Sequence, residues 1–274
     1  MMILPKLGQG TWRMGENPNT FKKEVEALQA GIEAGLSLID TAEMYGEGGA
    51  EKVVGEAIKP FYRDNLFLVS KVYPHHAGKD HLERSLHQSL ERMGTNYLDL
   101  YLLHWRGSIP LEETLKEMER MKSAGLIKNW GVSNFDTEDM MELFRLNNGS
   151  SCVVNQVLYH LASRGTEFAL REWMRDHDVA MMAYCPLAKD GRRTIDPTED
   201  PQLIEMAHSY DLSVEQLLLA FVLHQNITAI PKASTKEHVI ANAAMKDFQL
   251  KEEDFNRLSR LYPAPTSRES LDIV

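Results

Sequence analysis

Short apolar segments recur along this chain and alternate with segments of helical periodicity. Eight of them cover residues 36–40, 66–72, 98–105, 127–134, 153–159, 179–186, 228–232 and 247–250. Most are continuously apolar rather than alternating with polar residues, which is typical of strands buried on both faces of a parallel sheet. Eight such strands, separated by helices in a chain of 274 residues, predict an α/β fold of the (β/α)8 TIM barrel type.

The segments between the predicted strands carry helix signals. Phe21, Val25, Leu28 and Ile32 are spaced by three or four residues, so they would share one face of a helix. N-terminal capping pairs are predicted at Asp80 with Glu83, Ser213 with Gln216, and Ser234 with Glu237. Gly94 is a stop signal for the helix that begins near Asp80.

The glycine-rich segments do not indicate a doubly wound dinucleotide-binding sheet. Such a sheet needs three spaced glycines between its first strand and a following helix. The GQG of residues 8–10 lacks the third glycine and a following helix, and the GEGG of residues 46–49 has the wrong spacing. No linker divides the chain, so residues 1–274 are predicted to form a single barrel domain.

Charge and composition exclude several classes of partner. The chain has 40 acidic and 30 basic residues and a net charge of −10, which argues against nucleic acid. It has no apolar run long enough for a membrane span and no signal-peptide pattern at its start. Cys152 and Cys185 have no metal-ligand spacing, so we expect reduced cysteines and no metal site. We therefore expect a cytoplasmic protein, acting as a monomer on a small molecule.

Three successive predicted strands end on polar side chains. These are Asp40, Lys71 and His104, and Tyr45 follows the first of them by five residues. Each has an ordinary structural explanation on its own: a turn cap, a lysine reaching water, a core histidine and a tyrosine covering a loop. In a (β/α)8 barrel, however, the carboxyl ends of the strands form one rim, where active sites lie. Four polar groups on this rim favour a catalytic site.

The four residue types suggest a division of labour. A buried lysine needs a partner, which Asp40 can supply, and a protonated Lys71 would lower the pKa of Tyr45 from about 10. Tyr45 would then serve as a general acid near neutral pH, while His104 orients the same substrate oxygen. Nothing in the set pairs a nucleophile with a base. The set can protonate an oxygen as charge develops on it, which is half of a carbonyl reduction, and the hydride must come from a cofactor.

Seven stretches together resemble the aldo-keto reductase family over essentially the whole chain. They are LIDTAEMYGEGGAEKVVGEAI, FLVSKV, YLDLYLLHW, WGVSNF, NQVLYH, AYCPL and IPKAS. Within the family, GQGTW and DTAEMYG are most similar to bacterial methylglyoxal and glyoxal reductases. The resemblance places the family's catalytic tetrad on Asp40, Tyr45, Lys71 and His104, the residues reached from the strand ends.

The resemblance also implies a nicotinamide site at later strand ends. Ser133, Asn134 and Gln156 would bind the carboxamide, and Tyr184 would stack on the ring. The ordinary alternatives are that Asn134 and Gln156 satisfy backbone groups and that Tyr184 is core packing.

The diphosphate site would follow the predicted strand that ends in AYCPL. Leu187 would contribute a backbone N–H, and Cys185 stands where the family usually has serine. Lys189 and Arg192 would close over the diphosphate or belong to a solvated loop.

The IPKASTKEHVIAN segment implies a choice of cofactor. The helix predicted to begin at Ser234 would present free N–H groups, and Lys232, Ser234 and Thr235 would add charge and hydroxyls for a 2′-phosphate. A solvated charge cluster is the alternative. His238 stands where the family often has arginine and Asn242 matches an adenine contact. These features predict NADPH as cofactor, with weaker rejection of NADH than is usual.

Four aromatic residues are expected to line the carbonyl pocket: Trp12, Tyr45, His104 and Trp105. The two tryptophans could instead be core or rim packing. Only eleven residues follow Pro263, so small aldehydes and α-ketoaldehydes are the favoured substrates. The alternatives are a reductase of sugar-derived or steroid ketones, a non-catalytic nicotinamide-binding redox sensor, and a Schiff-base aldolase using Lys71.

Overall fold

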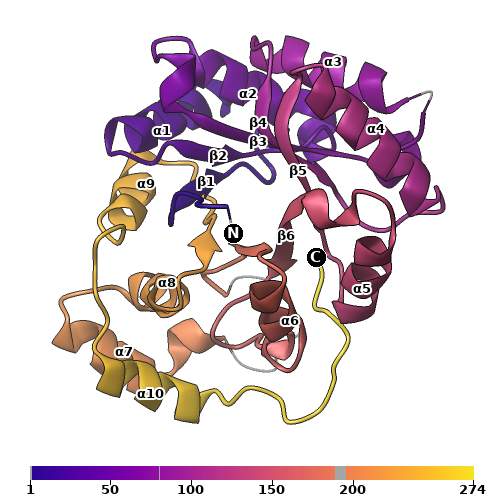
Figure 1. The fold of residues 1–274 in the computed structure, drawn as a ribbon. Helices are drawn as coiled ribbons and strands as arrows, with labels where there is room; N and C mark the ends of the chain where they lie inside the picture. Colours follow the sequence, from indigo (N-terminus) through magenta and orange to yellow (C-terminus); the bar gives the residue numbers. More distant parts are fainter. Residues whose placement is uncertain (1, 80, 189–195) are drawn as a thin grey trace.

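Eight parallel strands form the centre of the protein in the computed structural model, which describes residues 2–79, 81–188 and 196–274. Their order in the sheet follows the chain. They are β1 (Gly8–Gly10), β2 (Leu38–Asp40), β3 (Phe67–Val72), β4 (Leu98–Leu103), β5 (Ile127–Ser133), β6 (Cys152–Leu158), β7 (Ala180–Tyr184) and β8 (Thr228–Ala229). Parallel bridges from Leu7 to Ala229 and from Gly10 to Lys232 join the two edges. The sheet therefore closes into the predicted barrel (Figure 1).

Ten α-helices among the described residues surround the strands (Figure 1). They are α1 (Phe21–Glu33), α2 (Gly49–Ile58), α3 (Leu82–Met93), α4 (Leu111–Ser123), α5 (Thr137–Arg145), α6 (Leu170–Asp176), α7 (Pro201–Ser209), α8 (Val214–His224), α9 (Lys236–Ala243) and α10 (Glu252–Leu261). Within the described ranges, no helix is both long and apolar enough to span a membrane.

The helix signals were mostly confirmed. Gly94 ends α3 with a left-handed φ of 64°, and the Ser213–Gln216 capping box begins α8. The predicted cap Asp80 lies outside the described residues. The Ser234–Glu237 box was wrong by one residue, because Thr235 is the residue with extended backbone, and its hydroxyl accepts the His238 N–H.

One predicted strand was wrong and one strand was missed. Residues 247–250 form a loop in which Phe248 N–H bonds Met245 O at 3.2 Å. The missed strand is β1, whose glycines are required by close packing. A Cβ on Gly8 would lie 2.4 Å from Leu38 Cδ2, and one on Gly10 would lie 2.7 Å from Ile230 O. Glycine disfavours strands, which hid β1 in the sequence.

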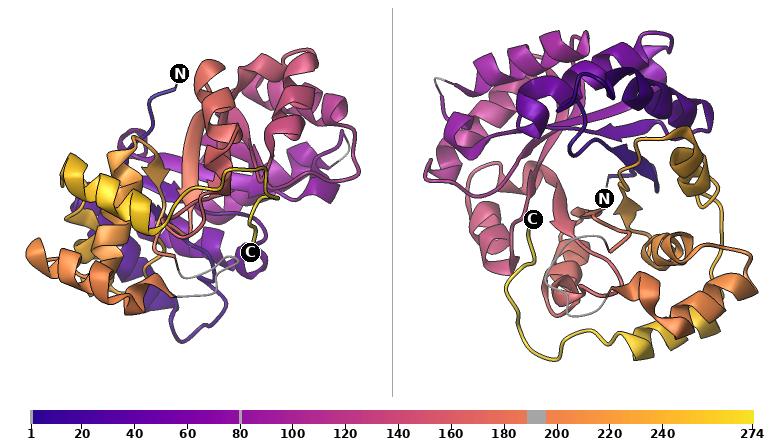
Figure 2. Two further views of the ribbon diagram at one scale, coloured as in Figure 1. Left: turned by 90° about the horizontal axis from the view of Figure 1, so that it is seen from below. Right: turned by 180° about the vertical axis from the view of Figure 1, so that it is seen from behind.

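The other seven predicted strands coincide with β2–β8. Because β1 was missed, each predicted site residue belongs to a strand numbered one higher than expected. Asp40 ends β2, Lys71 lies near the end of β3, and His104 follows β4 directly. Asp40 is paired with Val69, and Lys71 with Leu102. The two ends of the chain lie on opposite sides of the barrel, as the left view of Figure 2 shows. The C-terminal segment reaches the side where the strands end, because Val274 lines the same cavity as Asp40.

Candidate active site

Lys71 is the centre of a hydrogen-bond network at the end of the barrel. Its Nζ donates to Asp40 Oδ2 at 2.7 Å, to Thr41 O at 2.9 Å and to Tyr45 OH at 3.1 Å. Gln156 Nε2 donates to the other Asp40 oxygen at 2.7 Å. The structure therefore brings Asp40, Lys71 and Tyr45 together, as the strand ends predicted.

The Lys71–Asp40 pair is removed from water. The side chains are 0% and 3% exposed, respectively. Burial raises the pKa of Asp40 and lowers the pKa of Lys71, while their attraction for each other opposes both shifts. A buried pair is strongly favoured over either charge alone, so each residue holds the other in its ionised form.

The predicted lowering of the Tyr45 pKa is wrong. Burial raises the pKa of Tyr45 well above its usual 10, and Asp40 and Cys185 raise it further. The prediction considered the positive charge of Lys71 but neither the removal of the phenol from water nor the effect of the Asp40 charge on the phenol. Tyr45 is consequently a neutral phenol that keeps its proton at all moderate pH values.

His104 contacts Tyr45 edge to face, with ring centroids 5.7 Å apart. Burial lowers the pKa of His104 well below 6.5, and Lys71 lowers it further, so the ring is neutral. Its Nδ1 is buried without a hydrogen-bond partner in the described part of the chain. An unsatisfied acceptor is tolerated better than an unsatisfied N–H, so we place the proton on Nε2. This tautomer can donate a hydrogen bond to a substrate oxygen.

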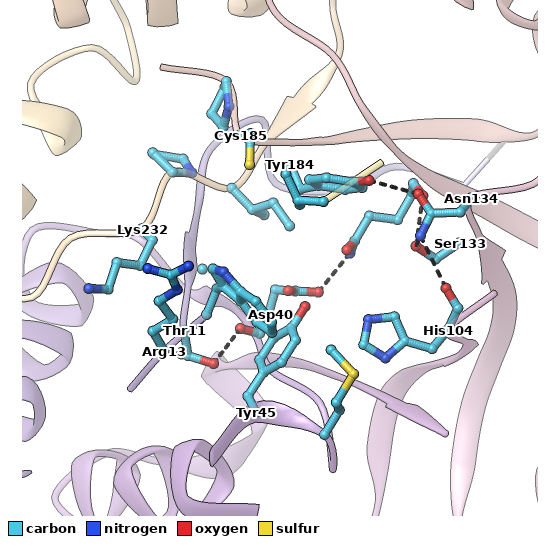
Figure 3. Close-up of a pocket in the computed structure, with 18 of the residues that line it drawn as sticks. Thr11, Arg13, Asp40, Tyr45, His104, Ser133, Asn134, Tyr184, Cys185 and Lys232 are labelled. Atoms are coloured by element: carbon cyan, nitrogen blue, oxygen red, sulfur yellow. Dashed lines mark hydrogen bonds between the residues drawn. The ribbon is translucent and has the colours of Figure 1, made fainter. Parts of the chain in front are cut away.

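A cavity of about 1150 Å³, counting the space at its open mouth, lies above this network. Eleven of the predicted site residues line it: Trp12, Asp40, Tyr45, His104, Trp105, Ser133, Asn134, Gln156, Tyr184, Leu187 and Lys232. Many of them point toward one another in Figure 3. Trp12 packs edge-on against Tyr45 with centroids 4.9 Å apart. Lys71 lies beneath the cavity and contacts it through Asp40 and Tyr45.

A second set of hydrogen bonds connects β5, β6 and β7. Tyr184 OH donates to Asn134 Oδ1 at 2.8 Å, and Asn134 Nδ2 donates to Ser133 Oγ and His104 O, both at 3.2 Å. Ser133 Oγ donates to Gln156 O at 2.8 Å. Figure 3 shows this chain of contacts along one wall of the cavity. Asn134 thus satisfies a backbone carbonyl while lining the cavity, so for this residue the structural and binding explanations are compatible. The Gln156 side chain donates to the Asp40 carboxylate rather than to a backbone group.

Comparison with known proteins agrees with this geometry. Residues 6–263 match the Aldo/keto reductase family. The chain belongs to the aldo/keto reductase family. It is 50% identical over 272 residues to methylglyoxal reductase YeaE of Escherichia coli, covering 99% of this chain and 95% of that protein. It is 32% identical to a glyoxal reductase of Bacillus subtilis, covering 94% and 89%.

Solved structures support the same assignment. The crystal structure of an aldo/keto reductase from Klebsiella pneumoniae, in complex with NADP and acetate, superimposes with a TM-score of 0.96. The two sequences are 52% identical, and the match covers 99% of this chain and 96% of the other. The fold and the enzyme class predicted from the sequence are therefore confirmed.

The β8 side of this reductase is less enclosed than the tetrad. Lys232 lines the cavity and is exposed. Four residues predicted to bind cofactor lie outside the cavity lining, at or within α9: Ser234, Thr235, His238 and Asn242. Ser234 and Thr235 are half-buried, His238 is exposed and Asn242 is buried. The structure does not gather these four around the space above Tyr45.

The N-terminus of α9 is partly occupied by its own side chains. Thr235 accepts the His238 N–H. The Glu237 carboxylate accepts hydrogen bonds from the Glu237 backbone N–H and from the Thr235 side chain, and these lower its pKa. The expectation of free N–H groups at this end is therefore only partly met. Lys232 and His238 are exposed basic side chains at this end.

Arg13 is the main lining residue that sequence reasoning missed. It follows β1 with a left-handed φ of 62°, and it lines the cavity together with Lys232 (Figure 3). Neither side chain forms an ion pair within the described ranges. The available signal in the sequence was a basic residue directly after Trp12. Its place at the cavity was not evident because β1 was not recognised as a strand. The predicted diphosphate contacts Lys189 and Arg192 lie outside the described residues.

Proposed function

We propose that this protein reduces small aldehydes and α-ketoaldehydes, methylglyoxal among them, to alcohols with NADPH, using Tyr45 as the general acid. The observation that carries the proposal is the hydrogen-bonded sequence Asp40–Lys71–Tyr45, which ends in a neutral phenol at the base of an open cavity. The names of the relatives, methylglyoxal reductase and glyoxal reductase, support the substrate class.

The four residues of the tetrad would bind one substrate oxygen and transfer one proton to it. A carbonyl oxygen between Tyr45 OH and His104 Nε2–H would accept hydrogen bonds from both groups. Bound NADPH supplies the hydride that the carbonyl carbon needs. As charge develops on the oxygen, Tyr45 gives up its proton, which completes the alcohol. The phenolate left behind is stabilised by Lys71 Nζ, 3.1 Å away.

The raised pKa of Tyr45 fits reduction better than oxidation. A general acid must hold its proton before the reaction, and burial ensures that Tyr45 does. Oxidation of an alcohol would require the phenolate as a base, which burial disfavours. The resting protonation state of Tyr45 is therefore the one that carbonyl reduction requires.

The cavity fits a dinucleotide phosphate on two grounds. It extends from Tyr45 to Lys232, so a nicotinamide near the tetrad leaves the rest of the cofactor directed toward β8. The exposed cations Arg13 and Lys232 both line this cavity, in a chain with a net charge of −10. Local positive charge is what a polyanion needs on an acidic surface.

The pocket around the tetrad favours small, uncharged carbonyl compounds. Trp12 and Trp105 flank Tyr45 and His104, with His104 and Trp105 ring centroids 4.8 Å apart. Aromatic walls offer apolar contact and no fixed cation for a carboxylate. A small aldehyde can reach the phenol between them.

A substrate panel tests this function. Methylglyoxal, an aromatic aldehyde and a bulky ketone would be compared with NADPH and with NADH, following loss of the absorbance of the reduced nicotinamide. We expect methylglyoxal and the aromatic aldehyde to be reduced with higher kcat/KM than the ketone. Reduction of the bulky ketone alone would refute the substrate class. Tight NADPH binding without turnover of any carbonyl compound would instead indicate a redox sensor.

A further inference from the structure

A buried polar cluster lies behind β3, on the face opposite to Lys71. Glu51 of α2 accepts a hydrogen bond from Ser70 Oγ at 2.6 Å and another from Arg92 Nε at 2.6 Å. Glu51 and Ser70 are both 0% exposed. Successive strand residues point to opposite faces, so Ser70 faces α2 and α3 while Lys71 reaches the tetrad. These helices lie side by side outside β3 (Figure 1).

The same cluster contacts the turn that carries Tyr45. This turn, Tyr45–Gly48, has three successive left-handed residues, with φ of 57° at Gly46, 52° at Glu47 and 84° at Gly48. A non-glycine residue in this conformation costs about 1–3 kcal/mol and persists only where its surroundings impose it. Arg92 is part of those surroundings, because a Cβ on Gly48 would lie 2.6 Å from Arg92 Cδ.

We propose that Glu51, acting through Ser70 and Arg92, is a positioning residue that sets the separation of Tyr45 OH from Lys71 Nζ. Glu51 binds the strand that carries Lys71 and also the side chain packed on the Tyr45 turn. Glu51 therefore connects the strand that carries Lys71 with the turn that carries Tyr45. The Nζ and OH atoms of these two residues are 3.1 Å apart. A displacement of about 1 Å in a reacting group can lower a rate by about 10²-fold. This inference rests on the proposed function, since it concerns the same proton transfer.

The negative charge of Glu51, like its hydrogen bonds, supports the proposed role, because it helps to keep Lys71 protonated. Burial lowers the pKa of Lys71, whereas the carboxylates of Asp40 and Glu51 raise it. Loss of the Glu51 charge should therefore favour neutral Lys71 at a lower pH than in the parent protein. The alkaline limb of the kcat profile would then move to lower pH.

Two buried serines provide a matched test. Ser70→Ala removes the tie between Glu51 and β3 and leaves the Glu51–Arg92 pair intact. Ser89→Ala removes a hydrogen bond of 3.2 Å between the same Arg92 and an equally buried serine on α3. We expect kcat with methylglyoxal to fall about tenfold in Ser70→Ala, with KM and the Kd for NADPH unchanged. Ser89→Ala should stay within about twofold of the parent protein.

A double variant separates positioning from simple stability. Glu51→Gln with Arg92→Met removes both charges of the buried pair, a change that is often neutral for stability. We expect a melting temperature near that of the parent and a kcat about tenfold lower. The alkaline limb should move less than it would on loss of the Glu51 charge alone, because the opposing charge of Arg92 is lost as well. A purely structural role predicts that kcat returns to its parental value with the stability.

These measurements distinguish a positioning role of Glu51 from a purely structural role. A Ser70→Ala protein that folds and matches Ser89→Ala in kcat would overturn the positioning role. If Ser70→Ala does not fold, a parental kcat in the double variant would overturn it. Failure of the parent protein to reduce any aldehyde would count against the proposed function instead.

Discussion

The two sides of the cavity differ in whether their charged side chains are buried and paired within the protein. On the catalytic side, at the ends of β2–β4, Asp40 and Lys71 are buried and hydrogen-bonded to each other. On the phosphate side, near β8 and α9, Lys232 and His238 are exposed. Buried charges must be paired to be tolerated, whereas exposed basic side chains remain accessible to an anion. The catalytic side is thus held by contacts within the protein, while Lys232 and His238 on the proposed phosphate side are open to solvent.

Tyr45→Phe gives the largest expected effect and tests the catalytic side by its chemistry. The substitution removes the phenol that donates the proton and keeps the ring that packs against Trp12. We expect kcat for methylglyoxal to fall by about 10²–10⁴-fold, the usual contribution of a general acid. The Kd for NADPH, measured by quenching of tryptophan fluorescence, should hardly change. Turnover at the parental rate would show that another group supplies the proton.

Substitution of one lysine on each side compares their contributions to stability. Lys71→Met leaves Asp40 buried without its charged partner, so the free energy of unfolding should fall by about 3–5 kcal/mol. Lys232→Met removes an exposed charge and should change it by less than about 0.5 kcal/mol. Urea denaturation of the two variants measures both values. Equal losses would mean that the two sides are not distinguished by burial.

Acid pH should reveal the buried neutral histidine of the catalytic side. The folded-state pKa of His104 is well below the 6.5 of an ordinary histidine. Between these two values the unfolded chain binds a proton that the folded chain does not, so stability falls as pH decreases below 6.5. The slope from this residue approaches about 1.4 kcal/mol per pH unit.

His104→Gln provides the control for this pH dependence. Glutamine cannot titrate, so the variant should lose stability less steeply between neutral pH and pH values below 6.5. Thermal melts of both proteins over this range give the two slopes. Identical slopes would show that His104 does not contribute to acid destabilisation.

The catalytic side was largely predictable from the sequence because it depends on strand ends. Asp40, Lys71 and His104 each follow an apolar segment, and parallel strands bring such ends together. The pKa of Tyr45 was not predictable, since its direction depends on burial, which the sequence does not show. Strand β1 was missed because its packing against Leu38 and Ile230 requires glycine.

The phosphate side was predicted less well for a related reason. Ser234 and Thr235 are adjacent hydroxyl residues, and the choice of helix cap between them depends on backbone angles that the sequence leaves open. Arg13 follows β1 and Lys232 follows β8, and both line the cavity because these two strands are joined where the barrel closes. A shared position of this kind becomes visible only when the barrel is closed.

His238→Arg has the smallest expected effect and asks whether the phosphate side recognises the 2′-phosphate. Arginine offers two parallel N–H donors and a permanent charge, which histidine lacks. We expect the ratio of Kd for NADH to Kd for NADPH to rise about fivefold, or about 1 kcal/mol, as is usual for exposed ion pairs. His208→Arg adds the same charge at an exposed position on α7 and should leave the ratio unchanged. An equal change in both variants would reduce the effect to net charge. No change in either would place the 2′-phosphate away from α9, so that the two sides of the cavity would differ in burial but not in ligand recognition.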